Sequence, residues 1–239
     1  MFQILARASI CEKDFFMLKL KHMKIAWYGQ SCFKLLVKTN NGDKITILID
    51  PFSKDIGLNP PRCGADIVIV SHEHFDHNNV KTVSGEPFII DGPGEYDVKK
   101  VFIRGIYSFH DNSKGEEQGV NTISIIEAED MKICHLGDLG QKELSDNQLE
   151  KIGEVDILMI PVGGVYTING SEAVKIINQI EPKVVIPMHY KIPGLNVKLN
   201  PVEKFLEEIG AEKEIMEELS IQKKELTEEE MKVVVMKPL

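Results

Sequence analysis

Short apolar runs recur through most of the chain, and they are rich in Val and Ile and bounded by Gly, Pro or charged residues. Runs of this length are too short for a typical helix and predict buried β-strands. Strands are therefore expected at residues 25–28, 33–37, 45–49, 67–70, 101–109, 122–127, 132–136, 157–160, 184–187 and 233–236.

Helix-like segments are fewer and come later in the chain. Residues 145–152, 170–180 and 201–209 carry apolar side chains at helical spacing, and Ser171 is the expected N-cap of the second segment. The charged stretch 212–230 is expected to form a solvated helix and turn. Strands that come first and then alternate with helices are typical of a layered α/β domain.

The length of the chain, 239 residues with 43% apolar content, is enough to bury one sizeable core. We expect a single domain over residues 23–239, because Met23 opens the first predicted strand. Residues 1–22 are expected to be an N-terminal extension or a misassigned start, and we give them no function.

Charge and composition narrow the classes of partner. The net charge is −9 and no segment is rich in Lys and Arg. A nucleic-acid partner is not expected, because it would require several basic side chains facing phosphates, although a small phosphorylated substrate remains possible. No run approaches the roughly 18 apolar residues of a membrane span, the first 22 residues make a poor signal peptide, and the four cysteines are scattered. We therefore expect a cytoplasmic protein with reduced thiols and no membrane partner.

The most informative stretch is residues 71–77, which reads Ser-His-Glu-His-Phe-Asp-His and follows the apolar run 65–70. At a strand end the chain must turn, so His72 and His74 can aim at one point while Asp76 and His77 aim at a neighbouring one. Imidazole and carboxylate together suit zinc, iron or manganese. Such groups are costly to bury together without a cation, and the stretch therefore predicts a metal site with room for two ions.

The pattern H-x-H-x-D-H in this stretch resembles the signature of the metallo-β-lactamase fold hydrolases. Four further motifs follow the order of that family, and the resemblance covers nearly everything from Met23 onward. They are residues 47–51 with Asp50, 109–111 with His110, 136–138 with Asp138 and 186–190 with His189. The resemblance implies a four-layer αββα sandwich and a metal-dependent hydrolase.

The same resemblance implies two divalent ions, Zn²⁺ first and Mn²⁺ or Fe²⁺ as alternatives, that bind a hydroxide and polarise the substrate. Asp76 could also orient the hydroxide or relay its proton, so Asp76 and Asp138 are the implied catalytic carboxylates. The implied ligands are His72, His74 and His110 at one ion, Asp76, His77 and His189 at the other, and Asp138 shared between the two.

Several residues near these ligands are candidates for supporting roles. Asp50 is expected to fix the ring of a ligand histidine, and His135 to form hydrogen bonds from outside the ligand set. Tyr190, directly after His189, could present its phenol to a developing oxyanion, with simple packing as the alternative. Weaker candidates for substrate contact are the glycine-rich loops 92–96 and 163–166, together with Arg104 and Lys191 for a phosphate group.

Residues 27–33, 161–167 and 187–190 are similar to the branch of the family that includes the ascorbate 6-phosphate lactonase. That branch implies a small-molecule ester, lactone or phosphoester as substrate, and it suggests a homo-oligomer. Two alternatives stay open. One is a phosphodiesterase or nuclease of the same fold, and the other is a metal-binding relative without catalytic turnover.

Overall fold

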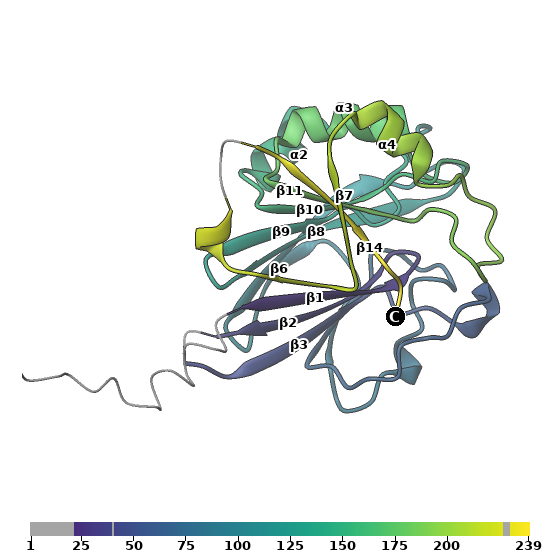
Figure 1. Cartoon of the computed structure of the whole chain (residues 1–239). Helices are drawn as coiled ribbons and strands as arrows, with labels where there is room; N and C mark the ends of the chain where they lie inside the picture. The colour runs from purple at the N-terminus through teal and green to yellow at the C-terminus, as the bar shows by residue number, and fades with distance from the viewer. Residues whose placement is uncertain (1–21, 40, 227–229) are drawn as a thin grey trace, which may run out of the picture.

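The computed structural model describes residues 22–39, 41–226 and 230–239. Two β-sheets lie face to face, and α-helices cover the outer face of one of them (Figure 1). This is the α/β sandwich that the alternation of elements predicts. The expected extension over residues 1–22 lies, apart from His22, outside the described residues.

The first sheet has six strands in the order β13-β1-β2-β3-β4-β5. Strands β13 to β3 pair antiparallel, and β3, β4 and β5 pair parallel. The strands are β1 Met23–Gly29, β2 Cys32–Lys38, β3 Lys44–Ile49, β4 Ile67–Ile69, β5 Phe88–Ile90 and β13 Glu218–Ile221.

The second sheet has eight strands in the order β12-β14-β11-β10-β9-β8-β7-β6. Its antiparallel half runs from β6 to β9, and its parallel half from β9 to β12. The strands are β6 Gly94–Val98, β7 Val101–Phe109, β8 Val120–Ala128, β9 Met131–His135, β10 Ile157–Pro161, β11 Val184–Met188, β12 Lys213–Met216 and β14 Lys232–Met236.

One continuous apolar core fills the space between the two sheets and extends to the helices. Trp27 and Phe33, on neighbouring strands, are fully buried there, with ring centroids 6.3 Å apart. The central strands β10 and β11 are buried along their whole length, because neighbours cover both faces of the sheet. Their uninterrupted apolar sequences follow from that position.

The predicted helices form with small shifts at their ends: α2 Asp146–Ile152, α3 Gly170–Ile180 and α4 Glu203–Ile209. Ser145 caps α2 in a capping box with Gln148. The prediction that Ser171 caps α3 is wrong, because Asn169 is the N-cap and accepts a hydrogen bond from the backbone N–H of Glu172. Asn169 lies two residues before Ser171 and forms a capping box with Glu172, so the helix begins earlier than predicted from Ser171.

The outer face of the first sheet is covered mainly by loops. These include the 3₁₀ turns η1 Lys54–Ile56 and η2 Val80–Thr82. Phe52 and Ile56 pack there against Val68 of β4 in a second apolar cluster. Within the described residues, the expected fourth layer is therefore built from irregular chain, while α-helices form the layer on the opposite side.

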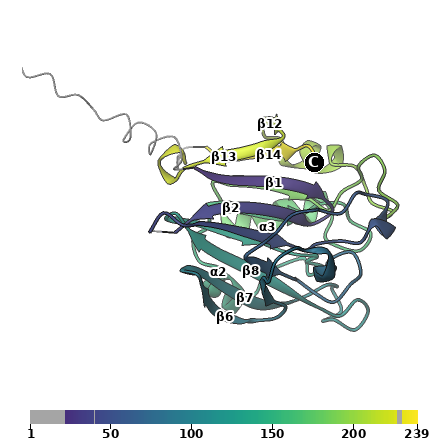
Figure 2. The same cartoon turned by 90° about the horizontal axis from the view of Figure 1, so that it is seen from below.

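The prediction of a solvated helix at residues 212–230 is wrong. The structure has β12, β13 and the 3₁₀ turn η3 Lys223–Glu225 in this stretch. Leu219 and Ile221 are buried while Glu218 and Ser220 point outward, which is the two-residue period of a strand. Figure 2 shows β12, β13 and β14 gathered at one side of the sandwich beside β1. Pairing with the sheet edges overrides the high charge of the segment.

Strand β3 pairs parallel with β4 in the first sheet, and β10 pairs parallel with β11 in the second, and the carboxyl ends of these strands meet at one edge of the sandwich. The loops that leave this edge carry all the predicted metal ligands. No helix among the described residues is long and apolar enough to cross a membrane.

Candidate metal centre

Every predicted ligand lies in the turn that directly follows a strand. The residues that follow β4 supply four of them. His110 and His189 come directly after β7 and β11, and Asp138 comes three residues after the end of β9. The structure brings these strand ends together into overlapping groups of buried or half-buried side chains. The groups are His72, His74 and His110; Asp76, His77 and His189; and His72, His77 and Asp138.

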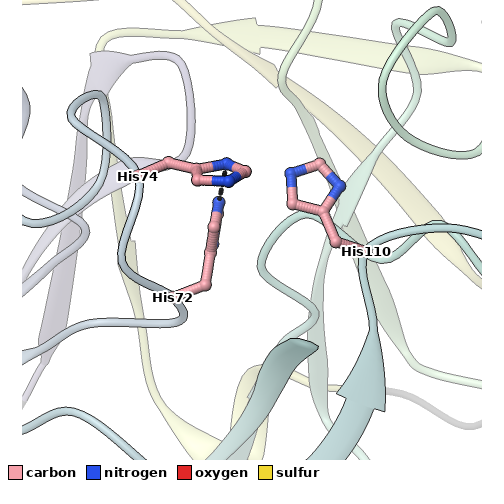
Figure 3. Close-up of side chains that lie close together, drawn as sticks. All are labelled: His72, His74 and His110. Atoms are coloured by element: carbon pink, nitrogen blue, oxygen red, sulfur yellow. Dashed lines mark hydrogen bonds between the residues drawn. The ribbon is translucent and has the colours of Figure 1, made fainter. Parts of the chain in front are cut away.

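The first of these, which we call the three-histidine group, is drawn in Figure 3. His72 and His74 point toward each other, with Nε2 of His72 3.0 Å from Nδ1 of His74. The ring of His110 approaches from the other sheet, with its centroid 4.7 Å from that of His72 and 5.0 Å from that of His74. Three imidazoles thus surround one point, and their ligand atoms lie within 4.8 Å of one another.

The second, which we call the aspartate group, consists of Asp76, His77 and His189, and its ligand atoms also lie within 4.8 Å of one another. Asp138 lies between the two groups. Its Oδ2 is 3.4 Å from Nε2 of His110, and it is 3.2 Å and 3.0 Å from the Nε2 atoms of His77 and His189. One carboxylate oxygen therefore faces imidazoles of both groups.

Asp50 determines the orientation of a histidine in each group. Its Oδ2 accepts a hydrogen bond from Nδ1–H of His77 at 3.0 Å and from the Ser71 hydroxyl at 2.7 Å. Because the Ser71 proton is used in this way, its oxygen accepts from Nδ1–H of His72, 2.9 Å away. Both histidines then carry their proton on Nδ1 and turn a bare Nε2 inward, as a metal ligand requires.

The environment of His77 fits a cation. Its bare Nε2 faces Asp138 at 3.2 Å and Asp76 at 3.5 Å, and a lone pair that faces two carboxylates is unfavourable unless a positive charge lies between them. In the metal-free protein a proton takes that place. Burial opposes the charged ring, but Asp138 and Asp50 outweigh burial and raise the pKa of His77 well above its usual value. A divalent cation would replace this proton.

The pKa values of His72 and Asp138 also fit a site that binds a cation. Burial, followed by the positive charge of His77, lowers the pKa of His72 to about 2, so His72 stays a neutral ligand. Burial alone would raise the pKa of Asp138, but the neighbouring imidazoles of His189 and His77 hold it well below its usual value. Neutral imidazoles and ionised carboxylates are the protonation states that bind divalent metals.

His135 lies outside the ligand groups and is fully buried. Its Nδ1 accepts a hydrogen bond from the backbone N–H of Gly137, so its proton is on Nε2 and donates to the carbonyl of Ser31. The Ser31 hydroxyl in turn donates to Oδ1 of Asp138 at 3.1 Å. His135 therefore contacts the ligand set only through Ser31 and the backbone before Asp138.

Sequence reasoning missed Asn121, which holds the turn that carries Asp138. Its Oδ1 accepts from the backbone N–H of Asp138, and its amide group donates to the carbonyl of Leu136. Gly137, between these two residues, has φ +56°, and a Cβ there would lie 2.3 Å from Oδ1 of Asn121. Only glycine fits this position. A lone Asn inside a strand carries no sequence signal for such a role.

Two site residues have left-handed backbone conformations that side chains rarely adopt. Asp50 has φ +46° and His189 has φ +51°. Each immediately follows a strand, and its side chain contacts the ligand groups. Strain of this kind is tolerated where the surrounding structure holds it, and it concentrates at functional sites.

The candidates for substrate contact have other partners. Tyr190 is buried, and the centroid of its ring lies 5.1 Å from that of Trp27. Its hydroxyl lies 3.4 Å from the carbonyl of Met236. These contacts correspond to the simple packing role that was the alternative to oxyanion binding. Arg104 pairs with Glu95 and with a backbone carbonyl. Residues 94–96, expected in a loop, belong to β6.

Comparison with known proteins places this geometry in a family. A family model described as a beta-lactamase superfamily domain matches residues 24–189. A crystal structure from Thermotoga maritima, described as a candidate Zn-dependent hydrolase of the metallo-β-lactamase superfamily, is 40% identical. It superposes with a TM-score of 0.74, and the match covers 90% of this chain and 98% of that one.

Two curated archaeal relatives agree with this result. A UPF0173 protein of Pyrococcus abyssi is 29% identical over 195 residues, which is 72% of this chain and 85% of its own. A UPF0173 metal-dependent hydrolase of Thermoplasma acidophilum is 26% identical over 199 residues, 72% of this chain and 84% of its own. The chain belongs to the metallo-β-lactamase superfamily and is a metal-dependent hydrolase with the fold of that superfamily.

Proposed function

We propose that this hydrolase uses two divalent cations, Zn²⁺ in the first instance, to cleave a small ester, lactone or phosphoester. The observation that carries the proposal is the arrangement of the two ligand groups around Asp138. Each group has three ligand atoms within 4.8 Å, and Oδ2 of Asp138 faces both groups. A single ion would leave one group without a cation.

The two carboxylates of the site differ in exposure and so in their proposed roles. The Asp138 side chain is 3% exposed and has imidazoles of both groups around it, which suits a ligand shared by two ions. The Asp76 side chain is 12% exposed and belongs to one group only. Asp76 is therefore the carboxylate that orients water and accepts its proton.

Bound cations would supply a water molecule with a pKa near neutrality and a Lewis acid for the carbonyl or phosphoryl oxygen of the substrate. Two of the described cysteines, Cys32 and Cys134, do not supply an alternative nucleophile. Cys32 and Cys134 are fully buried, and burial raises the pKa of both thiols. The Ser31 and Ser71 hydroxyls already donate to Asp138 and Asp50.

The surroundings of the site favour a small organic substrate over a nucleic acid. Phe75, between two ligands, is 61% exposed, and Val165 and Tyr166 are exposed in the loop that follows β10. The backbone of Gly163 in this loop lies against the carbonyl of His189, where a Cβ would approach within 2.1 Å. Apolar side chains thus lie beside the ligands, in a chain of net charge −9.

The test is a hydrolysis assay on metal-free protein reloaded with Zn²⁺ or Mn²⁺. The substrates are a phosphorylated sugar lactone, a simple aryl ester and a generic phosphodiester, and Asp138→Asn is the control. We expect turnover of the lactone or the ester that requires metal and is lost in the variant. Turnover of the phosphodiester alone would move the protein to the nuclease class. Folded, metal-loaded protein that cleaves none of the three would refute the proposed activity.

A further inference from the structure

The tip of the hairpin between β1 and β2 is buried against the metal centre. Gly29 pairs with Cys32, so Gln30 and Ser31 form a two-residue turn, and both are 0% exposed. Hairpin turns ordinarily lie at the surface, because their backbone groups are best satisfied by water. A fully buried turn must find partners in the protein, and these partners include the candidate ligands Asp76, Asp138 and His189.

Gln30 contacts two members of the aspartate group. Its side-chain Nε2 donates to Oδ2 of Asp76 at 3.0 Å. Its backbone carbonyl accepts from the backbone N–H of His189 at 3.0 Å and from Nε1–H of Trp27. The residue has φ +52°, so this double contact is made from a conformation that Gln rarely adopts.

The contacts of Gln30 are confined to one side of the centre. Oε1 of Gln30 is buried and has no hydrogen-bond partner among the described residues. The side chain therefore makes no hydrogen bond to the described residues beyond its bond to Asp76. None of the hydrogen bonds recorded for Gln30 reaches His72, His74 or His110.

Ser31 differs from its neighbour, since its hydroxyl donates to Oδ1 of Asp138, the carboxylate that faces both groups. Its backbone carbonyl accepts a hydrogen bond from Nε2–H of His135, and this bond anchors the turn. The two residues of the turn therefore act on different parts of the centre. Gln30 supports the aspartate group alone, and Ser31 supports the shared carboxylate.

We propose that Gln30 is a positioning residue that sets the affinity of the aspartate group for its cation, independently of the three-histidine group. This inference rests on the proposed function, because it assumes that both groups bind metal. Hydrogen bonds to a metal-binding carboxylate fix which oxygen faces the ion, and their loss typically lowers metal affinity by about 10- to 100-fold.

The test is a titration of the full-length, metal-free protein with Zn²⁺ against a competing chelator, which measures the affinity of each binding event. In Gln30→Met, which keeps the length of the side chain but removes its donor, one event should weaken by about 10- to 100-fold and the other should stay within about threefold. The same event should be lost in His189→Ala and kept in His74→Ala. Ser31→Ala should weaken both events.

Two further variants separate the contact from the stability of the turn. Gln30→Asn keeps the amide and suits a left-handed backbone better, but its side chain is one methylene too short for Asp76. It should weaken the same event as Gln30→Met without lowering thermal stability. Gln148→Met is the matched control, since Gln148 is a buried Gln of α2 whose partners are Tyr107, Gln141 and Ser145. It should leave both affinities unchanged.

Equal weakening of both events in Gln30→Met, or no weakening in Gln30→Asn, would overturn the proposal. If the wild-type chain binds a single ion, the proposed dinuclear function fails on its own. The role of Gln30 would then survive only if Gln30→Met and His189→Ala both weaken that single event. The two failures are therefore distinguishable.

Discussion

The two ligand groups use similar donor atoms but receive different support from the protein. In the aspartate group, Asp76 accepts from Gln30, His77 donates to Asp50, and the backbone of His189 is tied to the hairpin tip. In the three-histidine group only the ring of His72 is hydrogen-bonded to a side chain outside the ligand groups, that of Ser71, and the backbone N–H of His110 donates to the carbonyl of Gly119.

His74 shows the weaker support most clearly. It is half-buried, and its ring is hydrogen-bonded to His72, which is another member of the same group. Each group also has one imidazole, that of His110 or that of His189, whose buried Nδ1 has no hydrogen-bond partner among the described residues. Ligands that are held in place before the metal arrives lose less entropy on binding. Because side chains outside the group hold both Asp76 and His77, we expect the two groups to bind metal with unequal affinity, the aspartate group more tightly.

The largest expected effect concerns the stability of the metal-free protein. His77→Ala should lower the free energy of unfolding by about 3–5 kcal/mol, because it leaves the carboxylates of Asp50 and Asp138 buried without their cationic partner. His74→Ala, in the half-buried position, should change it by less than about 1 kcal/mol. Urea unfolding in the presence of a chelator measures both, and equal effects would contradict the difference in support.

A second prediction addresses Asp50, which orients a histidine of each group. Asp50→Asn keeps the shape of the side chain, but it should weaken both metal-binding events by about 10- to 100-fold, because the orientation of His77 and, through Ser71, of His72 is lost. Asp156→Asn is the control, since Asp156 is equally buried but pairs with Lys223 and Lys183. Selective loss of one event in Asp50→Asn would contradict the shared role.

A third prediction uses pH. Burial, only partly offset by Asp50, lowers the pKa of His135, so the folded protein keeps this ring neutral. Below about pH 6.5 the unfolded chain binds a proton at His135 that the folded chain does not, so the contribution of this residue to stability falls as the pH is lowered. In His135→Gln the fall should be shallower by up to about 1.4 kcal/mol per pH unit. Urea unfolding between pH 7 and pH 5 measures how the free energy of unfolding changes with pH in the wild type and in the variant. The two slopes would coincide if His135 were protonated in the folded protein.

The smallest effect is expected beside His189. Val165 has φ +67°, and Tyr166 N–H donates to the carbonyl of Gly164, as in a strained γ-turn. Val165→Gly should relieve this strain and stabilise the protein by about 0.5–1.5 kcal/mol after the entropy cost of glycine. Val120→Gly, a similarly exposed position in β8, should destabilise it. A thermal melt checks both signs, and a lower melting temperature for Val165→Gly would show that the turn is not strained.

The sequence predicted most strands, the three helices and the class of site, because apolar periodicity and the H-x-H-x-D-H spacing are local signals. The C-terminal strands were misread since their two-residue alternation, visible at Leu219 and Ile221, is short and diluted by charge. Strand β5 was missed for a related reason, as Phe88 and Ile89 are exposed at a sheet edge. Pairing partners far away in sequence decide such segments.

At the site, the predicted ligands all meet, but the residues that hold them were only partly foreseen. Asp50 was visible as a strand-end carboxylate. Gln30 and Ser31 stood in a conspicuous segment without an assigned role, because nothing local shows that a hairpin tip is buried. Asn121 gave no signal at all. Support of this kind arises from the packing of two sheets and cannot be read from spacing along one strand.

The central claim, two cations in one centre, is tested most directly by counting them. The measurement is native mass spectrometry of chelator-treated protein reloaded with Zn²⁺, with His74→Ala alongside. The account predicts two ions per wild-type chain and one in the variant, retained by the aspartate group. A single ion in the wild-type chain at saturating Zn²⁺, or two ions in the variant, would contradict it.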